Sequence, residues 1–245
     1  VQKVDNSLEE LKARGVFVLG LDASFPPLGF TDEDGNIVGY DIDLAKEVSK
    51  RLGVEFKAQP IDWDAKEMEL STGKIDCIWN GFTMTPEREE ALSFTKPYLN
   101  NDQVLIVKAD SGLTKLADMA GKKVGLQNGS SAQAAVDSNT EFAASLKDQV
   151  FYKENLTALN DLIIGGVDGV VMDSVVAAYD IAQSKKPLVI VNEVLSKEAY
   201  GVGFRKGDVK LRDEVQKILE EMANDGTVAA ISTKWFGSDI SVIGK

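Results

Sequence analysis

The chain has 245 residues, of which 44% are hydrophobic and 27% charged, a composition typical of a folded globular protein. The 27 basic and 39 acidic residues give a net charge of −12, which disfavours a nucleic-acid partner, because phosphate binding needs basic surface. The sequence contains no histidine, which excludes catalytic triads and metal sites built on imidazole. We therefore expect no nucleic-acid partner, no metal and no cofactor.

No apolar run approaches the roughly 18 residues that a membrane-spanning helix needs. The first residues, VQKVDNSLEELK, carry no apolar signal region, so we expect that an export signal was removed or never existed. The single cysteine, Cys77, lies in the apolar stretch KIDCIW and is expected to be a buried small hydrophobic residue.

Strands and helices alternate along the chain. Apolar and β-branched stretches predict strands at 17–21, 54–59, 75–79 and 103–108 in the first part of the sequence. Helical spacing predicts helices at 41–52 and 63–72, each closed by a glycine, and one that begins at Pro86 with Thr85 as N-cap.

The remaining sequence continues this rhythm. The predicted strands are 123–127, 169–172, 188–191 and 201–205. The predicted helices are 114–120, one from about Ser131, 156–164, 174–183, 209–224 and 227–236. Such alternation indicates an α/β fold with mostly parallel sheets.

One nine-residue pattern occurs twice. Residues 70–78 and 162–170 both read L-x-x-G-x-[IV]-D-x-[IV], 92 residues apart. Each copy is a helix end closed by glycine, followed by a buried strand that an aspartate introduces. The repeat predicts two α/β halves of similar topology, whose ligand site lies beyond the carboxyl ends of the strands.

The acidic segment DEDGNIVGYDID, residues 32–43, superficially resembles a calcium-binding loop. The EF-hand loop requires glycine at its sixth position, but Gly35 is fourth here. A hairpin turn between Phe30 and Ile37 is the favoured interpretation.

Two loops that follow predicted strands have the chemistry of anion receptors. In the first, NGFTMTPER, a helix start, the hydroxyl of Thr83 and the guanidinium of Arg88 suit a carboxylate, although an ordinary loop with a surface arginine is an open alternative. In the second, QNGSSA, Gln127 precedes a glycine turn and the helix-opening Ser130 and Ser131.

Three further positions have a structural and a binding interpretation. Asp173 ends the second repeated strand, where it either caps the next helix or receives a cation. Asp22 and Phe25 follow the first strand and are presented by Pro26-Pro27, so that Phe25 either stacks on a ligand or belongs to the core. Trp63 is either an aromatic residue of the site or a packing anchor.

Several of these segments together resemble one protein family. They are SFPPLGFTDEDGNIVGYDIDLAKEVSKRLG, KIDCIWNGFTMTPERE, FTKPY, GLQNGSSA, VVMDSVVA, GVGFRKGD and NDGTVAAISTKWFG. In this order they resemble the polar amino-acid-binding proteins of ABC importers, a group of bacterial extracytoplasmic solute-binding proteins that includes arginine, glutamine, histidine and cystine binders. The resemblance covers essentially the whole chain.

The resemblance implies a two-lobed periplasmic-binding-protein fold of type II. Each lobe would be a mostly parallel sheet flanked by helices, with the ligand cleft between the lobes. Residues 1–100 and 204–245 would form the first lobe and residues 101–203 the second, with hinges near 100–101 and 200–203.

The resemblance also implies the residues that hold the two charges of an amino acid. Arg88 aligns with the arginine that binds the α-carboxylate, with the Gly81 backbone and the Thr83 hydroxyl as donors beside it. Ser131, with Ser130 nearby, aligns with the carboxylate donor of the second lobe. Asp173 aligns with the acid that binds the α-ammonium group.

Further residues would contact the ligand side chain. Phe25 aligns with the stacking aromatic residue and Asp22 with a residue that recognises the side chain, whereas Trp63 and Asn80 fall where the family varies with its ligand. Because Asp22 favours a cationic or donor-bearing side chain, we expect arginine. Glutamine is the next alternative, although some glutamine binders place a histidine beside the aspartate, and this chain has none. Cystine, histidine, lysine, acidic amino acids and broad specificity remain open, although the charge of Asp22 disfavours an acidic side chain.

The resemblance therefore predicts a binding protein without catalytic residues, which delivers its amino acid to an ABC permease. We expect a monomer in the periplasm or on the extracellular face of the membrane, where a lipid anchor is an open alternative. Two other classes remain as alternatives. The first is an enzyme similar to cyclohexadienyl dehydratases, and the second is the sensor domain of a receptor.

Overall fold

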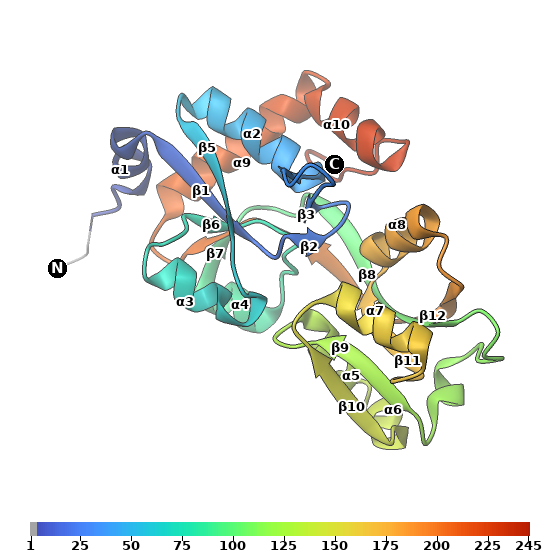
Figure 1. Cartoon of the computed structure of the whole chain (residues 1–245). Helices are drawn as coiled ribbons and strands as arrows, with labels where there is room; N and C mark the ends of the chain where they lie inside the picture. The colour runs from blue at the N-terminus through green and yellow to red at the C-terminus, as the bar shows by residue number, and fades with distance from the viewer. Residues whose placement is uncertain (1–3) are drawn as a thin grey trace. The chain divides into compact units, whose positions relative to one another are not determined.

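The computed structural model describes residues 4–245, and within them the chain divides into two units (Figure 1). Unit 1 contains the chain up to Ala23, Leu28–Asn100 and Ala199–Lys245. Unit 2 contains Asn101–Glu198 together with the short segment Ser24–Pro27. Strands β8 (Leu99–Lys108) and β12 (Leu188–Tyr200) both run through a boundary between the units, so the chain passes from one unit to the other within regular structure.

Unit 1 has a five-stranded sheet with the order β5-β1-β6-β13-β7. Its strands are β1 (Val16–Leu21), β5 (Glu55–Pro60), β6 (Cys77–Ile78), β7 (Leu92–Phe94) and β13 (Gly203–Arg205). Strand β1 pairs in parallel with β5 and β6, while β13 pairs antiparallel with β6 and β7. Phe17, Leu19 and Leu21 alternate along β1 and therefore share one face of the sheet, and all three are fully buried.

Helices cover the sheet of unit 1. They are α1 (Ser7–Arg14), α2 (Tyr40–Leu52), the 3-10 turn η1 (Trp63–Ala65), α3 (Lys66–Ser71), α4 (Pro86–Ala91), α9 (Val209–Asn224) and α10 (Thr227–Phe236). Helices α2, α9 and α10 contact one another, and α3 and α4 lie on the other side of the sheet (Figure 1). The apolar spacing that predicted α2 is confirmed, because Ile42, Ala45 and Val48 are fully buried.

Unit 2 repeats this plan with a five-stranded sheet in the order β10-β9-β11-β8-β12. Besides β8 and β12, its strands are β9 (Lys123–Gln127), β10 (Asp148–Tyr152) and β11 (Gly169–Asp173). Its helices are the 3-10 turn η2 (Leu116–Met119), α5 (Ser131–Ser138), α6 (Thr140–Ser145), α7 (Asn155–Ile164) and α8 (Ser174–Ser184). Strand β9 pairs in parallel with β10 and β11, and β11 pairs antiparallel with β8.

The two sheets are equivalent strand by strand, which confirms the predicted two halves of similar topology. In the repeated pattern, the Asp76 carboxylate accepts the Val18 N–H at 2.7 Å and the Asp168 carboxylate accepts the Lys123 N–H at 2.9 Å. Each aspartate thereby ties the start of a central strand to its neighbour. The repeated pattern therefore marks the same aspartate–backbone hydrogen bond once in each unit.

A glycine lies at the equivalent position of the strands β1 and β9, next to the central strand of each sheet. A Cβ atom on Gly20 would come within 2.4 Å of the Ile75 side chain, and one on Gly125 within 3.4 Å of the Val167 side chain. Ile75 and Val167 hold the same position of the repeated pattern. The missing Cβ of Gly20 thus allows Ile75 to pack directly on the backbone of β1, whereas at Gly125 the closest side chain is the Tyr152 ring, 2.9 Å from the Cβ position.

Some predicted elements differ from the structure in length. Residues 75–79 form a strand only at Cys77–Ile78, although the Asp76 and Trp79 N–H groups still donate to backbone carbonyls of β1. The predicted helix at 114–120 is the four-residue turn η2, and the predicted strand at 188–191 extends to Tyr200. Strand β10 and helix α1 were not predicted, and both have largely polar or exposed surfaces.

The interpretation of residues 30–37 as a hairpin is confirmed. Strands β3 (Gly29–Thr31) and β4 (Ile37–Val38) pair antiparallel, and Gly35 has a φ of 83° in the turn. The short strand β2 (Ser24–Phe25) belongs to unit 2.

Cys77 is fully buried on β6, and burial raises the pKa of its thiol.

Candidate functional site

In unit 1, the predicted site residues follow the carboxyl ends of three adjacent parallel strands. Asp22 directly follows β1, Trp63 begins η1 after β5, and Asn80 follows β6. Because parallel strands end at the same edge of a sheet, these residues are gathered at one edge of the unit. All three are buried, with exposed fractions of 6%, 7% and 2% respectively.

The Asn80 side chain is bonded to the backbone of Asp22. Its Oδ1 accepts the Asp22 N–H at 3.0 Å, and its Nδ2 donates to the Asp22 carbonyl at 3.4 Å. An amide that makes two backbone hydrogen bonds holds a strand end in place. Asn80 was predicted to contact the ligand; in this arrangement it positions Asp22.

The Gly81 N–H, predicted to be a donor for the ligand carboxylate, is already hydrogen-bonded within unit 1. It donates to Asp41 Oδ2 at 2.8 Å and to the Tyr98 hydroxyl at 3.1 Å, and that hydroxyl donates to the same carboxylate oxygen. Asp41 is fully buried, and burial raises the pKa of its carboxyl to about 7, although both hydrogen bonds oppose the shift. A buried acid on α2 therefore supports the loop after β6.

Arg88 is held by its own helix and by an aromatic ring. Thr85 accepts the Arg88 N–H at 3.2 Å, which confirms the predicted N-cap of α4. The guanidinium donates to the Thr83 carbonyl at 3.0 Å and lies 4.5 Å from the centroid of the Phe82 ring. A guanidinium has five N–H donors, so it can bind an anion while it keeps this anchorage.

Besides Arg88, unit 1 has a buried cation, Lys66, which the sequence analysis did not name as a candidate site residue. Only 3% of it is exposed, its Nζ donates to the Trp63 carbonyl at 3.1 Å, and it lies 3.4 Å from Glu67 and 4.8 Å from the centroid of the Trp63 ring. Burial lowers the pKa of Lys66, and the charge of Arg88 lowers it further. The only sequence signal for this contact was that Lys66 lies three residues after Trp63. A lysine at that spacing in a helix is usually exposed to solvent, so the signal was weak.

Trp63 itself packs in the core of unit 1. Its ring lies edge-on to Phe82, with centroids 5.6 Å apart, within a cluster that includes Leu70, Ile75 and Ile78. The structure therefore shows the packing role that was one of its two predicted interpretations. Through Phe82, Trp63 also supports the ring on which Arg88 lies.

In unit 2, the predicted anion loop has a well-ordered set of internal bonds. Gln127 ends β9, donates to the Lys153 carbonyl at 3.0 Å and accepts the Asn155 amide at 3.2 Å. The Ser130 hydroxyl donates to the Gln127 carbonyl at 2.7 Å. The next residue, Ser131, begins α5 and is 7% exposed. Gln127 and Ser130 thus fix the turn, and Ser131 presents its hydroxyl at the helix start.

Asp173 ends β11 and does not cap α8 with its side chain, which excludes one of its two predicted interpretations. Its Oδ1 accepts the Gln103 amide at 2.8 Å, and its Oδ2 accepts the Asn101 amide at 3.1 Å. The Asn101 Oδ1 instead accepts the Val175 N–H at the start of α8, at 3.4 Å. Asp173 is therefore left as a carboxylate at a strand end, oriented by two amides of β8.

Glu198 is a second carboxylate in this cluster, and the sequence analysis missed it. Its Oε2 accepts the Asn101 and Gln103 amides, both at 3.1 Å, and the Ser131 hydroxyl at 3.3 Å. Glu198 lies in the irregularly exposed second half of β12, where no pattern indicated a function.

Phe25, the predicted stacking residue, is 6% exposed, and its strand β2 contacts α7.

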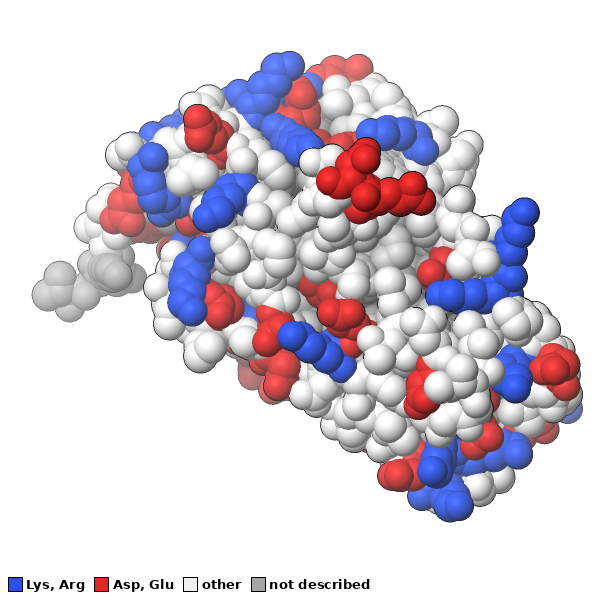
Figure 2. Space-filling model, viewed as in Figure 1, with Lys and Arg blue, Asp and Glu red and all other residues white. Residues whose placement is uncertain are grey.

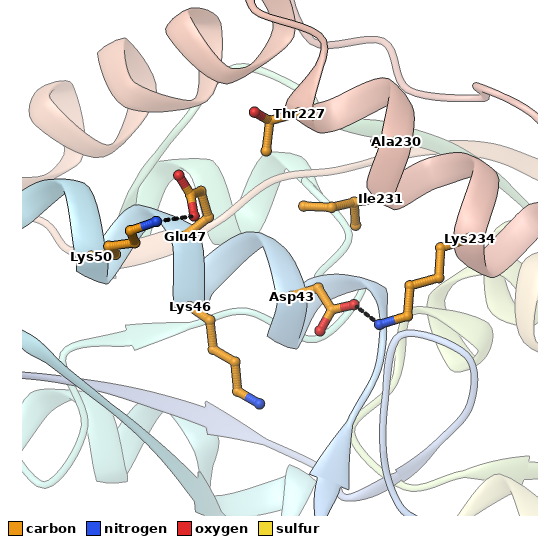
Figure 3. Close-up of a pocket in the computed structure, with 8 residues that line it drawn as sticks. All are labelled: Asp43, Lys46, Glu47, Lys50, Thr227, Ala230, Ile231 and Lys234. Carbon is orange, nitrogen blue, oxygen red and sulfur yellow. Dashed lines mark hydrogen bonds and ion pairs between the residues drawn. The ribbon is translucent and has the colours of Figure 1, made fainter.

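A separate hollow lies on the surface of unit 1 between α2 and α10. It measures about 490 Å³ and is lined by Asp43, Lys46, Glu47, Lys50, Thr227, Ala230, Ile231 and Lys234 (Figure 3). Lys234 lies 2.7 Å from Asp43, and Lys50 lies 3.9 Å from Glu47, so much of its charge is paired internally. On the face drawn in Figure 2, basic and acidic side chains are likewise interspersed.

Within residues 4–245, no group of three acidic or cysteine side chains is arranged to hold a metal ion.

Matches to known proteins establish the family. A model of the bacterial extracellular solute-binding proteins, family 3, matches residues 17–238. The chain belongs to this family. The L-cystine-binding protein TcyJ of Escherichia coli K12 is 32% identical to this solute-binding protein over 236 residues, which cover 96% of this chain and 87% of TcyJ.

Solved structures agree with the fold. A substrate-binding protein of an ABC uptake transporter from Streptococcus pneumoniae, solved with bound histidine, has a TM-score of 0.94 and 37% identity, covering 97% of this chain and 98% of its own. An ancestral arginine-binding protein bound to arginine has a TM-score of 0.85 and 40% identity, covering 91% and 99%.

The solute-binding protein therefore has the predicted two-lobed periplasmic-binding-protein fold. Family members bind amino-acid ligands and work with ABC transporter permeases. Among the helices of residues 4–245, none combines the length and apolar character needed to cross a bilayer.

Proposed function

We propose that this solute-binding protein captures one free L-amino acid with residues of both units and delivers it to an ABC permease. The observation that carries the proposal is the opposite charge of two side chains, one on the helix that follows β6 and one at the end of the equivalent strand β11. Unit 1 presents the anchored guanidinium of Arg88 after β6, and unit 2 presents the Asp173 carboxylate at the end of β11, the strand equivalent to β6. A zwitterion needs one partner of each sign.

The remaining contacts follow from the same placement. The Arg88 guanidinium binds the α-carboxylate with the Thr83 and Ser131 hydroxyls, and Asp173 binds the α-ammonium group. Phe25 covers the ligand side chain. Since full contact requires both units, ligand binding favours a closed arrangement through its differential contacts.

Arginine is the ligand that we propose first. Asp22 is a buried carboxylate at the end of β1, and its backbone is fixed by Asn80. A guanidinium gains a charge-assisted hydrogen bond from such an acid, whereas glutamine gains a neutral one. The arginine-bound ancestral relative supports this choice, while the cystine- and histidine-binding relatives keep those ligands, glutamine and broad specificity as alternatives.

A calorimetric screen of the twenty amino acids and cystine tests the proposal. We expect one or a few polar amino acids to bind, arginine most tightly, at one molecule per chain. Scattering in parallel should give a smaller radius of gyration with ligand. If none of these ligands bound, the proposed function would be wrong.

We further propose that the protein is a monomer without catalytic activity at the outer face of the cytoplasmic membrane or in the periplasm. The names of its relatives as binding proteins support the absence of catalysis. Incubation with prephenate or arogenate should yield no sustained product release. Light scattering after size-exclusion chromatography should give the mass of one chain, 26.5 kDa for the 245 residues.

A further inference from the structure

The loop after β6 carries the proposed carboxylate donors of unit 1, and its second half pairs with the chain at the end of β12. The Phe82 carbonyl accepts the Gly201 N–H at 3.0 Å, and the Met84 N–H donates to the Ala199 carbonyl at 2.9 Å. A Cβ atom on Gly201 would come within 2.8 Å of the Met84 sulfur, so the glycine allows this close approach. Main-chain bonds therefore fix the loop beyond Gly81.

Gly81 itself is held by two side chains. Its N–H donates to Asp41 Oδ2 at 2.8 Å and to the Tyr98 hydroxyl at 3.1 Å, and that hydroxyl donates to the same carboxylate oxygen at 2.9 Å. The φ of Gly81 is 55°, a left-handed conformation that glycine adopts readily. Tyr98 also donates its backbone N–H to the Tyr200 carbonyl at 2.9 Å, next to the residues that pair with the rest of the loop. One tyrosine therefore supports both halves of the loop.

Stability alone gives no reason for an acid at position 41. Asp41 and Tyr98 have no exposed surface, and Asp41 Oδ1 has no hydrogen-bond partner among residues 4–245. A buried acid with an unpaired oxygen costs free energy, which its place in the first turn of α2 offsets only in part. What the acid provides is one oxygen that accepts hydrogen bonds from both Gly81 and Tyr98. This arrangement fixes the backbone direction two residues before Thr83.

We propose that Asp41 and Tyr98 are positioning residues for the α-carboxylate of the bound amino acid and act on it through Gly81. This inference rests on the proposed function and adds two residues to it. Neither side chain reaches the ligand, because both are fully buried. They hold the loop so that the Thr83 hydroxyl and the Arg88 guanidinium, which donates to the Thr83 carbonyl, are already placed before the carboxylate arrives. Their loss should weaken the binding of the carboxylate and leave the binding of the other ligand groups unchanged.

The test compares the parent with four variants, which are Tyr98→Phe, Asp41→Asn, Asp41→Ala and Asp76→Ala. Tyr98→Phe removes one hydroxyl and keeps the ring. Asp41→Asn keeps an oxygen that can accept both bonds, whereas Asp41→Ala removes it. Asp76 is the matched control, because it is a 3% exposed acid of unit 1 that accepts a backbone N–H, from Val18 on β1, at 2.7 Å.

The probes are L-arginine, L-glutamine and L-histidine, each together with its α-carboxamide. An amide lacks the charge of the α-carboxylate but keeps the ammonium group and the side chain, and at pH 6 the amine is protonated in both forms. Calorimetry measures the amino acids and NMR competition measures the amides. Thermal unfolding without ligand reports on the fold of each variant.

We expect Asp41→Ala to lose about tenfold or more in affinity for every amino acid that the parent binds, and Tyr98→Phe about fivefold. The affinity of both variants for the amides should stay within about twofold of the parent, since no carboxylate is there to be positioned. Asp41→Asn should recover the amino-acid affinity to within about twofold. Asp76→Ala should unfold at a lower temperature and bind every probe as the parent does. Tyr98→Phe decides the matter if Asp41→Ala does not fold.

Three outcomes would overturn the inference and leave the proposed function intact. The first is amino-acid affinity within twofold of the parent in both Tyr98→Phe and Asp41→Ala. The second is a loss of equal factor for the amino acids and their amides, which would mean that the two residues support the site as a whole. The third is an equal loss in Asp41→Asn and Asp41→Ala, which would contradict the role of the shared acceptor. If the parent bound no amino acid, the proposed function itself would fail, and the inference with it.

Discussion

The two units have the same sheet order but differ in the sign of the charge that their site segments carry. Unit 1 has Arg88 on α4, after β6, and the buried Lys66 on α3, after β5. Unit 2 has Asp173 at the end of β11 and Glu198 on β12. The aspartates of the repeated pattern also differ between the units in burial and in charged partners. Asp76 is 3% exposed and lies 2.6 Å from Arg14, whereas Asp168 is exposed. The two halves therefore share one topology, while the chemistry of their side chains differs.

Arg88→Ala removes the cation that distinguishes unit 1. We expect a loss of about 3 kcal/mol or more in amino-acid binding, because neutral hydroxyls cannot replace a charged, two-pronged contact. Arg212→Ala on α9 is the control and should bind as the parent does. Calorimetry with the best ligand of the screen measures both, and binding by Arg88→Ala within threefold of the parent would contradict the assignment.

The aspartates of the repeated pattern should differ in their effect on stability. Asp76→Ala leaves the Val18 N–H unpaired next to a buried strand and is expected to cost about 3 kcal/mol in the free energy of unfolding. Asp168→Ala exposes the Lys123 N–H to water and should cost under about 1 kcal/mol. Urea unfolding of both variants checks the difference, and equal losses would show that the two hydrogen bonds contribute alike.

Asp22 directly follows β1 and Gln127 ends the equivalent strand β9, and only Asp22 is charged. Asp22→Asn preserves the size of the side chain and should weaken arginine binding more than glutamine binding, by at least about 1 kcal/mol. Dissociation constants for both ligands, on parent and variant, provide the measurement. Equal losses would remove the specificity role of Asp22 and our preference for arginine.

The loop after β6 is supported by a buried acid, whereas the equivalent loop of unit 2 begins with Asp173 itself. The pKa of Asp41 is raised from 3.8 to about 7 in the folded protein. Between these values the unfolded chain releases this proton and the folded chain keeps it, so this group makes the protein less stable as the pH rises from about 4 to about 7.

Asp41→Asn has no proton to release and should lose less stability across this pH window than the parent. We expect a difference in slope of under about 1.4 kcal/mol per pH unit, the limit for one proton. Melting temperatures from pH 4 to pH 8 measure it, with Asp34→Asn in the exposed turn as the control. Parallel curves for parent and Asp41→Asn would mean that Asp41 is ionised throughout.

The sequence predicted the elements whose signals are local. Helices α9 and α10 begin and end where their apolar spacing predicted, and Thr85 caps α4 as expected. The length of β6 was overestimated because apolar composition does not reveal where the ladder ends. Strand β10 was missed because its partly exposed residues show no clear alternation.

The candidate site was predictable only where a side chain belongs to a motif. Arg88 and Asp173 stand in recognisable segments, whereas Lys66 and Glu198 stand among ordinary polar residues of a helix and a long strand. Their contacts depend on partners that are distant in sequence, such as Gln103 for Glu198. A local sequence pattern does not predict a contact between residues so far apart in the chain. The bonds that occupy Asn80 and Gly81 were hidden for the same reason.

The burial of Cys77 has a practical consequence for measuring motion. A thiol with no exposed surface and a raised pKa reacts slowly with maleimides, because the thiolate is the nucleophile. Since the chain has one cysteine, two introduced surface cysteines, one on each unit, would carry a donor and an acceptor dye without replacement of Cys77. The chain therefore needs no cysteine removed before single-molecule energy transfer, which measures the separation of the units in one molecule at a time as amino acid is added.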